Sequence, residues 1–257
     1  MKIAVMNQKG GVGKTTVVHN LLVGLARRGL KVLGVDLDPQ ANLTTGFGVD
    51  PENGRNILSL MNSDVKYEDI IASKKGVDII PSSLELAEFD LLLSGEMMRE
   101  SKIKLVISKL EDNYDYILLD CGPTLGLLTI NAMVAVDKIF IPLQTEFYSM
   151  AGLKSLIKTI NKVKDNDLNS DLSILGIVLT LFDSRTRLHK QVLDVVKENF
   201  KEELFSTKIR INTDLATAPS HYKSIFDYAP RSNGAQDFHA LLDEFLKKVK
   251  KKELTNV

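Results

Sequence analysis

The chain has 257 residues, and its 33 lysine and arginine residues balance 33 aspartate and glutamate residues. A formal charge of zero provides no overall field for binding DNA or an anionic membrane, so such binding requires a local patch. The single cysteine excludes an internal disulfide and fits a reducing compartment. Met1 and Lys2 run directly into the first expected strand, and no apolar run reaches the ~18 residues of a membrane span, so we expect a cytoplasmic protein.

The first expected strand, at 3–6, leads into a loop rich in glycine and lysine. A segment with helical apolar periodicity begins at Val17, so the loop lies between a strand and a helix, which is the context that a phosphate-binding loop needs. The glycines permit a tight turn that aims backbone N–H groups inward, and the helix adds the positive end of its dipole. We therefore expect an anion to be held mostly by the main chain of this loop, which consists of Lys9, Gly10, Gly11, Val12, Gly13, Lys14, Thr15 and Thr16.

Two side chains of this loop have expected roles of their own. Lys14 supplies a positive charge for the β- and γ-phosphates of a nucleotide, and the Thr15 hydroxyl is placed to ligate Mg²⁺. The glycine spacing is shorter than in the general phosphate-loop pattern, because Gly10 and Gly13 are only three residues apart. A second lysine, Lys9, stands at the start of the loop.

The segment after the loop predicts a strand-helix-strand unit. The helix is expected at 15–28, with His19 and Asn20 as incidental residues and Gly29 as its stop. A buried strand at 32–36 follows, and a strand-helix-strand order requires a parallel sheet with a right-handed crossover.

Three aspartates stand at the ends of apolar strands. Asp36 ends the second expected strand, and Asp38 follows in the loop at its carboxyl end, where open α/β sheets place their ligands. Asp120 ends a further strand at 116–121, and its carboxylate can hold Mg²⁺ through water. Cys121 has no second cysteine or ligand cluster beside it, so we interpret it as a small buried residue.

The rest of the chain continues the alternation of strands and helices. Short helices are expected at 57–61 and 67–72, and a helical pattern over 84–110 breaks near Ser94 and Gly95. We interpret the Met97-Met98 pair in it as core or interface filler. Further strands are expected at 77–81, 138–142, 174–180 and 208–209, and further helices at 151–163, 190–200 and 235–251.

These elements predict an α/β fold in which a mostly parallel, twisted sheet has helices on both faces. No internal repeat or long linker interrupts the chain. We therefore expect residues 1–257 to form a single domain, with about residues 250–257 as a disordered tail.

Several motifs together resemble one family of nucleotide-binding proteins. The segment 9–15 resembles the deviant Walker A motif K-G-G-x-G-K-[ST] of the ParA/MinD class of P-loop ATPases, and 36–40 resembles the D-x-D-P-Q segment of ParA proteins of the small Soj type. The segment 116–126 is similar to their Walker B stretch, with Gly122 where a proline is usual. Further family blocks are similar to 127–132, 142–148, 218–221 and 227–235.

The resemblance implies a P-loop NTPase fold and an ATP-driven, Mg²⁺-dependent switch that forms a homodimer. Such proteins bind nonspecific double-stranded DNA when ATP-bound, associate with the nucleoid, and position chromosomes, plasmids or other cargo such as chemotaxis clusters and carbon-fixing compartments. A ParB-like partner with a basic N-terminus stimulates hydrolysis.

The resemblance also implies roles for single residues. Lys9 would reach the partner subunit's ATP, and Asp38 would orient the attacking water, while Asp36 and Asp120 would act through Mg²⁺-bound water. The adenine-side loop of the family aligns with 209–212, which supplies Asn212 but has Arg210 where proline is usual.

The DNA-binding residues follow the family pattern only in part. The first of a pair of arginines aligns with Arg185, whereas the second aligns with Asp214, which has the wrong charge for a phosphate contact. Either the DNA site has moved to nearby basic residues, or this protein uses another surface, or these basic residues are only solvated charges. The nearby basic residues are Arg187, Lys208, Arg210, Lys223 and the lysine-rich run 247–252.

Two rival classes stay open. A MinD-like membrane ATPase ends in an amphipathic membrane helix, but here the apolar stripe of Leu241, Leu242, Phe245 and Val249 favours packing on the domain. A metabolic enzyme on this scaffold is the other rival. One cysteine per chain argues against an iron–sulfur electron carrier, and an amidoligase or small-molecule kinase needs an acceptor pocket that the sequence does not locate.

Overall fold

The computed structural model describes residues 1–51, 54–61, 65–146 and 149–255, with side chains as far as Lys251. An eight-stranded sheet runs through the protein in the order β3-β4-β2-β5-β1-β6-β7-β8. All neighbouring strands are parallel except β3 and β4. The strands are β1 Lys2–Val5, β2 Val32–Leu37, β3 Ala72–Lys74, β4 Val77–Ile80, β5 Tyr116–Cys121, β6 Lys138–Gln144, β7 Ser173–Phe182 and β8 Leu204–Arg210.

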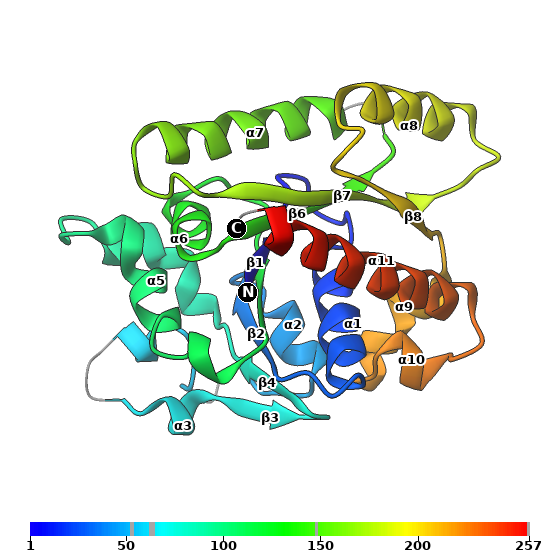
Figure 1. Ribbon diagram of the computed structural model, residues 1–257. Coiled ribbons are helices and arrows are strands. Elements are labelled where there is room, and N and C mark those ends of the chain that lie inside the picture. Colours follow the sequence, from blue (N-terminus) through cyan, green and yellow to red (C-terminus); the bar gives the residue numbers. More distant parts are fainter. Residues whose placement is uncertain (52–53, 62–64, 147–148, 256–257) are drawn as a thin grey trace.

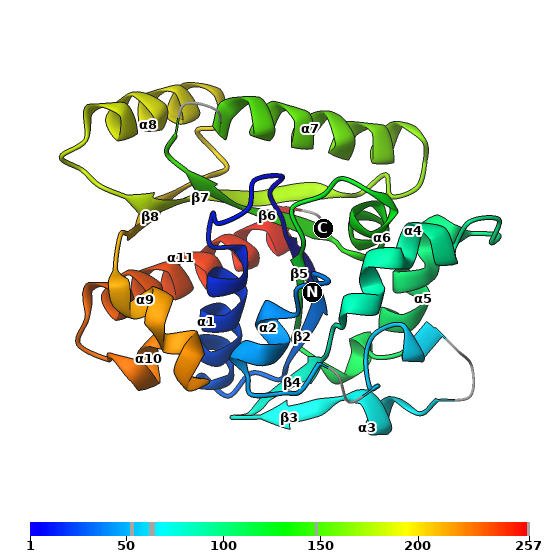
Figure 2. The same ribbon diagram turned by 180° about the vertical axis from the view of Figure 1, so that it is seen from behind.

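Helices cover both faces of the sheet (Figures 1 and 2). Hydrophobic cores on the two faces show which helices lie on each. One face carries α1 Lys14–Ala26, α2 Asn42–Gly46, α9 Thr213–Thr217, α10 Ile225–Tyr228 and α11 Asn233–Thr255. The other carries α4 Phe89–Leu92, α5 Lys102–Ile107, α6 Leu127–Ala135, α7 Ser149–Asp165 and α8 Arg187–Asn199. The predicted α/β class, with a mostly parallel sheet between two helical layers, is confirmed.

The central strands are apolar on both sides because both sides are covered. In β1, Ala4 packs into the core under α6, while Ile3 and Val5 pack into the core under α1 and α11. The four apolar residues expected to form a stripe on the last helix, Leu241, Leu242, Phe245 and Val249, are all buried in this second core. The stripe therefore packs on the domain, as expected.

Shorter elements complete the chain. The helix expected at 67–72 is α3, Tyr67–Ile70. The segment 84–110 is broken, as predicted, and its pieces are η2 Leu84–Glu88, α4, η3 Arg99–Ser101 and α5. The remaining single turns are η1 Ser59–Met61, η4 Glu111–Asn113 and η5 Ala218–His221.

Some expectations about single residues are wrong. Of the two roles expected for the Met97-Met98 pair, filling a core is wrong, because the side chains are 86% and 65% exposed. The other role, filling an interface, stays a prediction. His19 and Asn20 are buried rather than incidental, and Asn20 Oδ1 accepts the backbone N–H of Ile225 at 2.8 Å. An α-helical pattern cannot show these contacts, because the partner lies two hundred residues away in the sequence.

Other boundaries differ from the pattern. The antiparallel strand β3 was not predicted, and β8 is longer than the pair of residues expected. Helix α11 reaches Thr255 instead of ending at Lys251, and the end of the expected tail, 256–257, lies outside the described residues, as do 147–148 of one family block. Among the described helices, none has the length and apolar character needed to cross a membrane.

Candidate functional site

The carboxyl ends of β2, β5 and β1 meet because these strands are adjacent in the sheet. In the strand register, Asp120 of β5 lies opposite Asp36 of β2 on one side and Val5 of β1 on the other. The loop that follows β1 therefore begins beside both carboxylates. The glycine-rich loop, Asp36 and Asp120, which predicted a phosphate site from the sequence, therefore lie together at one edge of the sheet.

The loop has the geometry of an anion cradle. Gly11 and Gly13 have φ values of 73° and 86°, a left-handed conformation that side chains with a Cβ rarely adopt. Gly13 is the N-cap of α1, and no heavy atom lies within 4 Å of where its Cβ would be. On the other side of the loop, the Thr180 hydroxyl donates to Val12 O at 2.8 Å. The loop is thus fixed to β7 while its inner surface stays open.

Lys14 is drawn into this site. Its side chain is buried, and Nζ donates to the backbone oxygen of Lys9 at 3.2 Å across the loop. Burial lowers the pKa of Lys14, and the nearby carboxylates of Asp120 and Asp38 oppose the shift. A positive charge held in a partly dry position beside an open cradle is suited to bind phosphate.

Two cavities flank the loop. One of about 570 Å³ is lined by the loop residues Gly10, Gly11, Gly13, Lys14, Thr15 and Thr16 together with Asp38. Another of about 190 Å³ shares Gly11, Gly13 and Thr16 with the first and is lined by Arg210 and Asn212. The structure thus brings Thr15 and the expected base-side residues to two adjoining cavities along one loop, an arrangement that fits an extended nucleotide.

The two buried aspartates are held differently. Asp36 is fixed by Thr44, whose backbone N–H and hydroxyl donate to Oδ2 at 2.8 and 2.7 Å. Burial raises the pKa of Asp36 to about 6 in spite of these hydrogen bonds. For Asp120, neither oxygen has a hydrogen-bond partner among the described residues. Burial, and then the neighbouring Asp36, raise the pKa of Asp120 well above its usual range, and the nearby Thr15 side chain and the charge of Lys14 oppose this only in part.

An unpartnered buried carboxylate fits a cation. Leaving such a group without a partner costs free energy, about 1–3 kcal/mol or more when it is charged. A divalent ion between Asp120 and the Thr15 hydroxyl would remove that cost, and Asp36 stands within reach of the same ion through water. The donor set consists of oxygen atoms alone, which is the chemistry that Mg²⁺ prefers.

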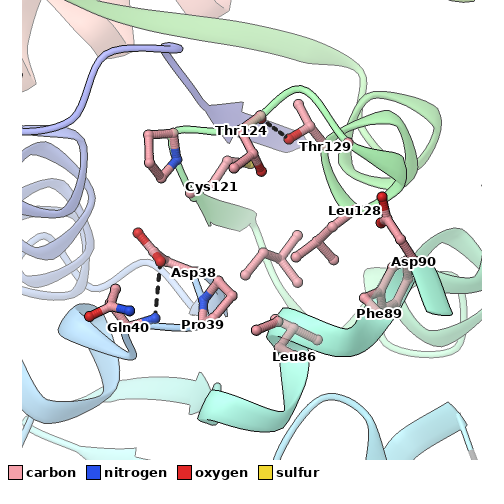
Figure 3. Close-up of a pocket in the computed structure, with 15 residues that line it drawn as sticks. Asp38, Pro39, Gln40, Leu86, Phe89, Asp90, Cys121, Thr124, Leu128 and Thr129 are labelled. Carbon is pink, nitrogen blue, oxygen red and sulfur yellow. Dashed lines mark hydrogen bonds between the residues drawn. The ribbon is translucent and has the colours of Figure 1, made fainter. Parts of the chain in front are cut away.

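Asp38 lies between two cavities. Its Oδ1 accepts the N–H of Gln40 at 3.0 Å, and its backbone oxygen accepts the Ser82 hydroxyl at 2.7 Å. It lines the 570 Å³ cavity beside the phosphate loop and also a cavity of about 400 Å³ on its other side (Figure 3). A Cβ at Gly122 would be 3.5 Å from the Asp38 carboxyl carbon. The carboxylate therefore stands where a water molecule could approach bound phosphate.

Lys9 is held by its own chain. Its Nζ donates to Gln144 Oε1 at 3.0 Å and forms an ion pair with Glu146. Neither acceptor was anticipated from the sequence, because each lies more than a hundred residues away at the end of β6. In this conformation Lys9 points to β6 and is about one-third exposed.

The residues expected on the adenine side are partly occupied with structural contacts. Asn212 Oδ1 accepts the N–H of Leu215 at 3.1 Å and so caps α9, which leaves the amide Nδ2 as the group that can meet a base. The Arg210 guanidinium pairs with Asp237, with Nη2 to Oδ1 at 2.7 Å. Both residues line the small cavity, but Arg210 is already neutralised.

Three of the basic residues considered for DNA share a groove. Arg185, Lys208 and Arg210 line a cavity of about 550 Å³ at the β7–β8 edge, and Arg187 begins α8 close by in the chain. Lys223 is exposed after η5, where its N–H bonds to Ala218 O, and is not among the lining residues of that groove. These five basic residues therefore do not form one patch.

The basic side chains of this groove already have partners within the chain, either an aspartate or an aromatic ring. Arg185 is 88% exposed but binds Asp183 with two hydrogen bonds, at 3.0 and 2.8 Å, and this contact lowers the pKa of Asp183 to about 2. Lys208 Nζ lies 5.2 Å from the centre of the Phe182 ring. In the C-terminal lysine run, Lys248 is used structurally, since its Nζ donates to Glu202 O at 2.8 Å.

Similarity to known proteins agrees with this geometry. Residues 1–174 match the protein family described as AAA domain. The chain is 42% identical over 245 residues to the sporulation initiation inhibitor protein Soj of Bacillus subtilis (strain 168), covering 94% of this chain and 96% of that protein. It is 37% identical over 243 residues to the chromosome-partitioning ATPase Soj of Treponema pallidum (strain Nichols), covering 94% and 95%.

A solved structure shares the fold. The crystal structure of cobyrinic acid a,c-diamide synthase from Mycobacterium smegmatis with bound ADP and magnesium matches with a TM-score of 0.84 and 31% identity, over 97% of this chain and 95% of that one. This chain has a glycine-rich loop, a buried Lys14, and the carboxylates of Asp36 and Asp120 at the same register of two adjacent strands. The two Soj relatives match it almost from end to end. The chain therefore belongs to the ParA/Soj-type P-loop ATPases of the ParA/MinD family.

Proposed function

We propose that this protein is an ATP-dependent dimerising switch that partitions chromosomes or plasmids, binds DNA without sequence preference in its ATP state, and is stimulated by a ParB-like protein with a basic N-terminus. The observation that carries the ATPase part is the unpartnered carboxylate of Asp120 beside the open phosphate loop. The name of the Treponema pallidum relative, a chromosome-partitioning ATPase, supports the partitioning part.

The roles of the residues follow from their positions. The loop backbone and Lys14 bind the β- and γ-phosphates, and Asn212 meets the base. Thr15, Asp36 and Asp120 would hold Mg²⁺, which would supply positive charge to the phosphate oxygens when bound. Asp38 orients a water whose oxygen bonds to the γ-phosphorus as the bond to the bridging oxygen breaks, giving ADP and phosphate.

Lys9 carries the dimerising step in this proposal. In the single chain, Glu146 and Gln144 hold it, so contact with a partner's nucleotide requires that it leave them. Lys9→Ala is expected to keep ATP binding and lose the ATP-dependent dimer, which light scattering and a fluorescent-ATP titration measure. If the Lys9→Ala protein still dimerises on ATP, the role in trans is wrong.

DNA binding is the part of the proposal with the weakest support, because the arginines of the groove are paired with aspartates of the same chain. The groove at the β7–β8 edge offers Arg185 and Lys208, and two copies of a weak patch on one dimer bind one polyanion with avidity. Duplex binding should require ATP and weaken steeply with salt, because counterions are released. Gel shifts with unrelated duplexes test this.

Arg185→Glu should lower the affinity equally for all sequences, whereas Lys223→Glu, the same charge change away from the groove, should have a smaller effect. Lack of binding with ATP at low salt would remove DNA from the proposal.

A small-molecule enzyme is the second candidate. The 400 Å³ cavity next to Asp38 is large enough for an acceptor, and a solved structure of similar fold is named as a synthase. ATP hydrolysis by the purified protein with no acceptor present, stimulated by DNA and a partner, favours the switch. Hydrolysis that depends on a small acceptor favours the enzyme.

A further inference from the structure

The segment 84–98 exposes an unusual amount of apolar side chain. Among the described residues, five of the ten large hydrophobic side chains that are exposed lie in this short stretch. They are Leu84 at 71%, Leu91 at 73%, Leu92 at 54%, Met97 at 86% and Met98 at 65%. We call these five side chains the 84–98 surface. Figures 1 and 2 show that the chain after α4 projects from the body of the protein.

Single exposed leucines need no explanation, but a cluster of this kind marks an interaction surface. Two adjacent methionines add a flexible and polarisable part that adapts to different partners.

The charges on the same segment have one sign. Glu85, Glu88, Asp90 and Glu96 are all exposed, and no lysine or arginine occurs between residues 84 and 98. Glu96 is paired with Lys102 of α5 at 3.0 Å, and Glu85 accepts a long hydrogen bond of 3.5 Å from Asn56. The apolar residues therefore stand among carboxylates, which attract a cationic partner and repel a polyanion.

This segment also forms one wall of the 400 Å³ cavity. Leu86, Phe89 and Asp90 line it from η2 and α4, and Asp38 lines it from the opposite side (Figure 3). Asp90 Oδ2 lies 3.5 Å from the backbone N of Leu127, at the start of α6. A cationic side chain entering the cavity would thus have a carboxylate at each side, one of which is the proposed water-orienting residue.

We propose that the 84–98 surface binds a basic amphipathic segment of another protein, with leucine-like side chains on the exposed apolar residues and a lysine or arginine in the cavity between Asp90 and Asp38. The apolar side chains provide the contact area, and the carboxylates select the basic partner. DNA and anionic membranes are disfavoured occupants, because the segment carries only negative charge. A second copy of the chain would bring these carboxylates against one another if the contact were symmetric.

The effect on hydrolysis rests on the proposed function, but the binding itself does not. A cation beside Asp38 changes the field at the γ-phosphate and can hold the carboxylate in the position from which it orients water. The surface would therefore couple partner binding to ATP turnover.

The test measures binding to the full-length protein in ADP by fluorescence anisotropy. The probe is a labelled synthetic peptide with leucine at positions i, i+3, i+4 and i+7 and with lysine or arginine elsewhere. Two control peptides have the same composition with the leucines spread around the helix, or glutamate in place of the basic residues. Binding of the first peptide should be much tighter than that of either control and should weaken with salt.

Two pairs of substitutions probe the surface separately. Leu91→Ser with Met97→Ser removes apolar area, and Glu85→Lys with Glu88→Lys reverses charge. Each pair should weaken peptide binding by about tenfold or more, since the central side chains of an interface contribute more than about 1 kcal/mol each. The matched controls are Leu188→Ser and Glu198→Lys on α8, which are exposed but distant in the chain, and they should bind as the unchanged protein does.

Three results would overturn the proposal. Equal binding of all three peptides would show that the surface distinguishes neither the arrangement of leucines nor the sign of the charge. Unchanged binding by both double variants would place the peptide elsewhere. Loss of ATP-dependent dimerisation in both double variants, without loss of peptide binding, would make the surface a contact between copies. A protein that binds the peptide but does not hydrolyse ATP would contradict the proposed function and leave this surface in place.

Discussion

The phosphate site and the β7–β8 groove hold charges in opposite ways. At the phosphate site Lys14, Asp36 and Asp120 are buried, and the Asp120 carboxylate has no hydrogen-bond partner within the part of the chain that the structure describes. At the groove, Arg185 is largely exposed and Arg210 is partly exposed, and each is paired with an aspartate of its own chain. Both regions were predicted from charged residues in the sequence, yet only one leaves a charge for a ligand to neutralise.

The difference shows what makes a charged residue informative. A buried, unpaired charge is costly, so a ligand that compensates it gains much of that free energy. An exposed pair of opposite charges is nearly balanced, and a ligand must break it before binding. We therefore expect large and specific effects from substitutions at the phosphate site and small, graded effects at the groove.

Lys14→Ala should have the largest effect. The loop backbone remains, but the buried cation is lost, and a hydrogen bond to a charged group is worth roughly 1.5–3 kcal/mol, or about 10–100-fold in affinity. ATP binding should therefore weaken by about that factor or more, and hydrolysis should become undetectable. A fluorescent-ATP titration measures this, with circular dichroism to show that the fold is kept. Tight ATP binding by the variant would contradict the role of Lys14.

Asp38→Ala should separate binding from turnover. The Asp38 carboxylate accepts a hydrogen bond from Gln40 at 3.0 Å and is not part of the loop that holds the phosphates. The variant should therefore bind ATP and dimerise, while hydrolysis falls on the order of 100-fold because the attacking water is no longer oriented. Single-turnover hydrolysis and light scattering measure the two properties. If the variant fails to bind Mg²⁺-ATP, Asp38 is a metal or structural residue, and the roles of Asp36 and Asp38 must be exchanged.

His19 tests whether burial alone marks a ligand site. Its Nε2 is buried and has no hydrogen-bond partner in the described ranges of the chain, but the residue lines neither of the two cavities beside the loop. Burial lowers the pKa of His19 to about 4, with a smaller contribution from Lys75 that Asp227 opposes. Because the unfolded chain takes up the proton first, stability should fall as the pH decreases from about 6.5 to about 4, by up to roughly 3 kcal/mol.

His19→Leu should remove that part of the pH dependence and leave ATP affinity unchanged. Urea unfolding at several pH values measures it. Gln236→Leu, at an exposed position of α11, provides the control for a leucine substitution away from this site and should keep the slope of the unchanged protein. A loss of ATP affinity in His19→Leu would mean that this buried group also serves the nucleotide site.

Asp183→Asn should have the smallest effect and the opposite sign. It frees Arg185 from its carboxylate partner, so ATP-dependent DNA affinity should rise roughly two- to fivefold, the range expected for an exposed ion pair. Asp194→Asn on α8 makes the same charge change without touching that pair and serves as the control. Equal gains in both variants would mean that only net charge matters at this edge.

The sequence by itself determined the centre of the fold. Apolar runs ending in Asp36 and Asp120, and a glycine-rich loop between a strand and a helix, were enough to predict a parallel sheet with a phosphate site at its carboxyl edge. These signals are local, because a buried parallel strand and a tight loop each require particular residues within a few positions. The short strand β3 gave no such signal.

The tertiary structure alone decided which charges are available. The ion pairs of Lys9 with Glu146 and of Arg210 with Asp237 join residues far apart in the chain, so no pattern of spacing reveals them. The same holds for the exposure of Met97 and Met98, which the sequence suggested as core or interface filler. Whether a side chain is buried, paired or free depends on neighbours that only the folded chain brings together, and it is those neighbours that set its free energy.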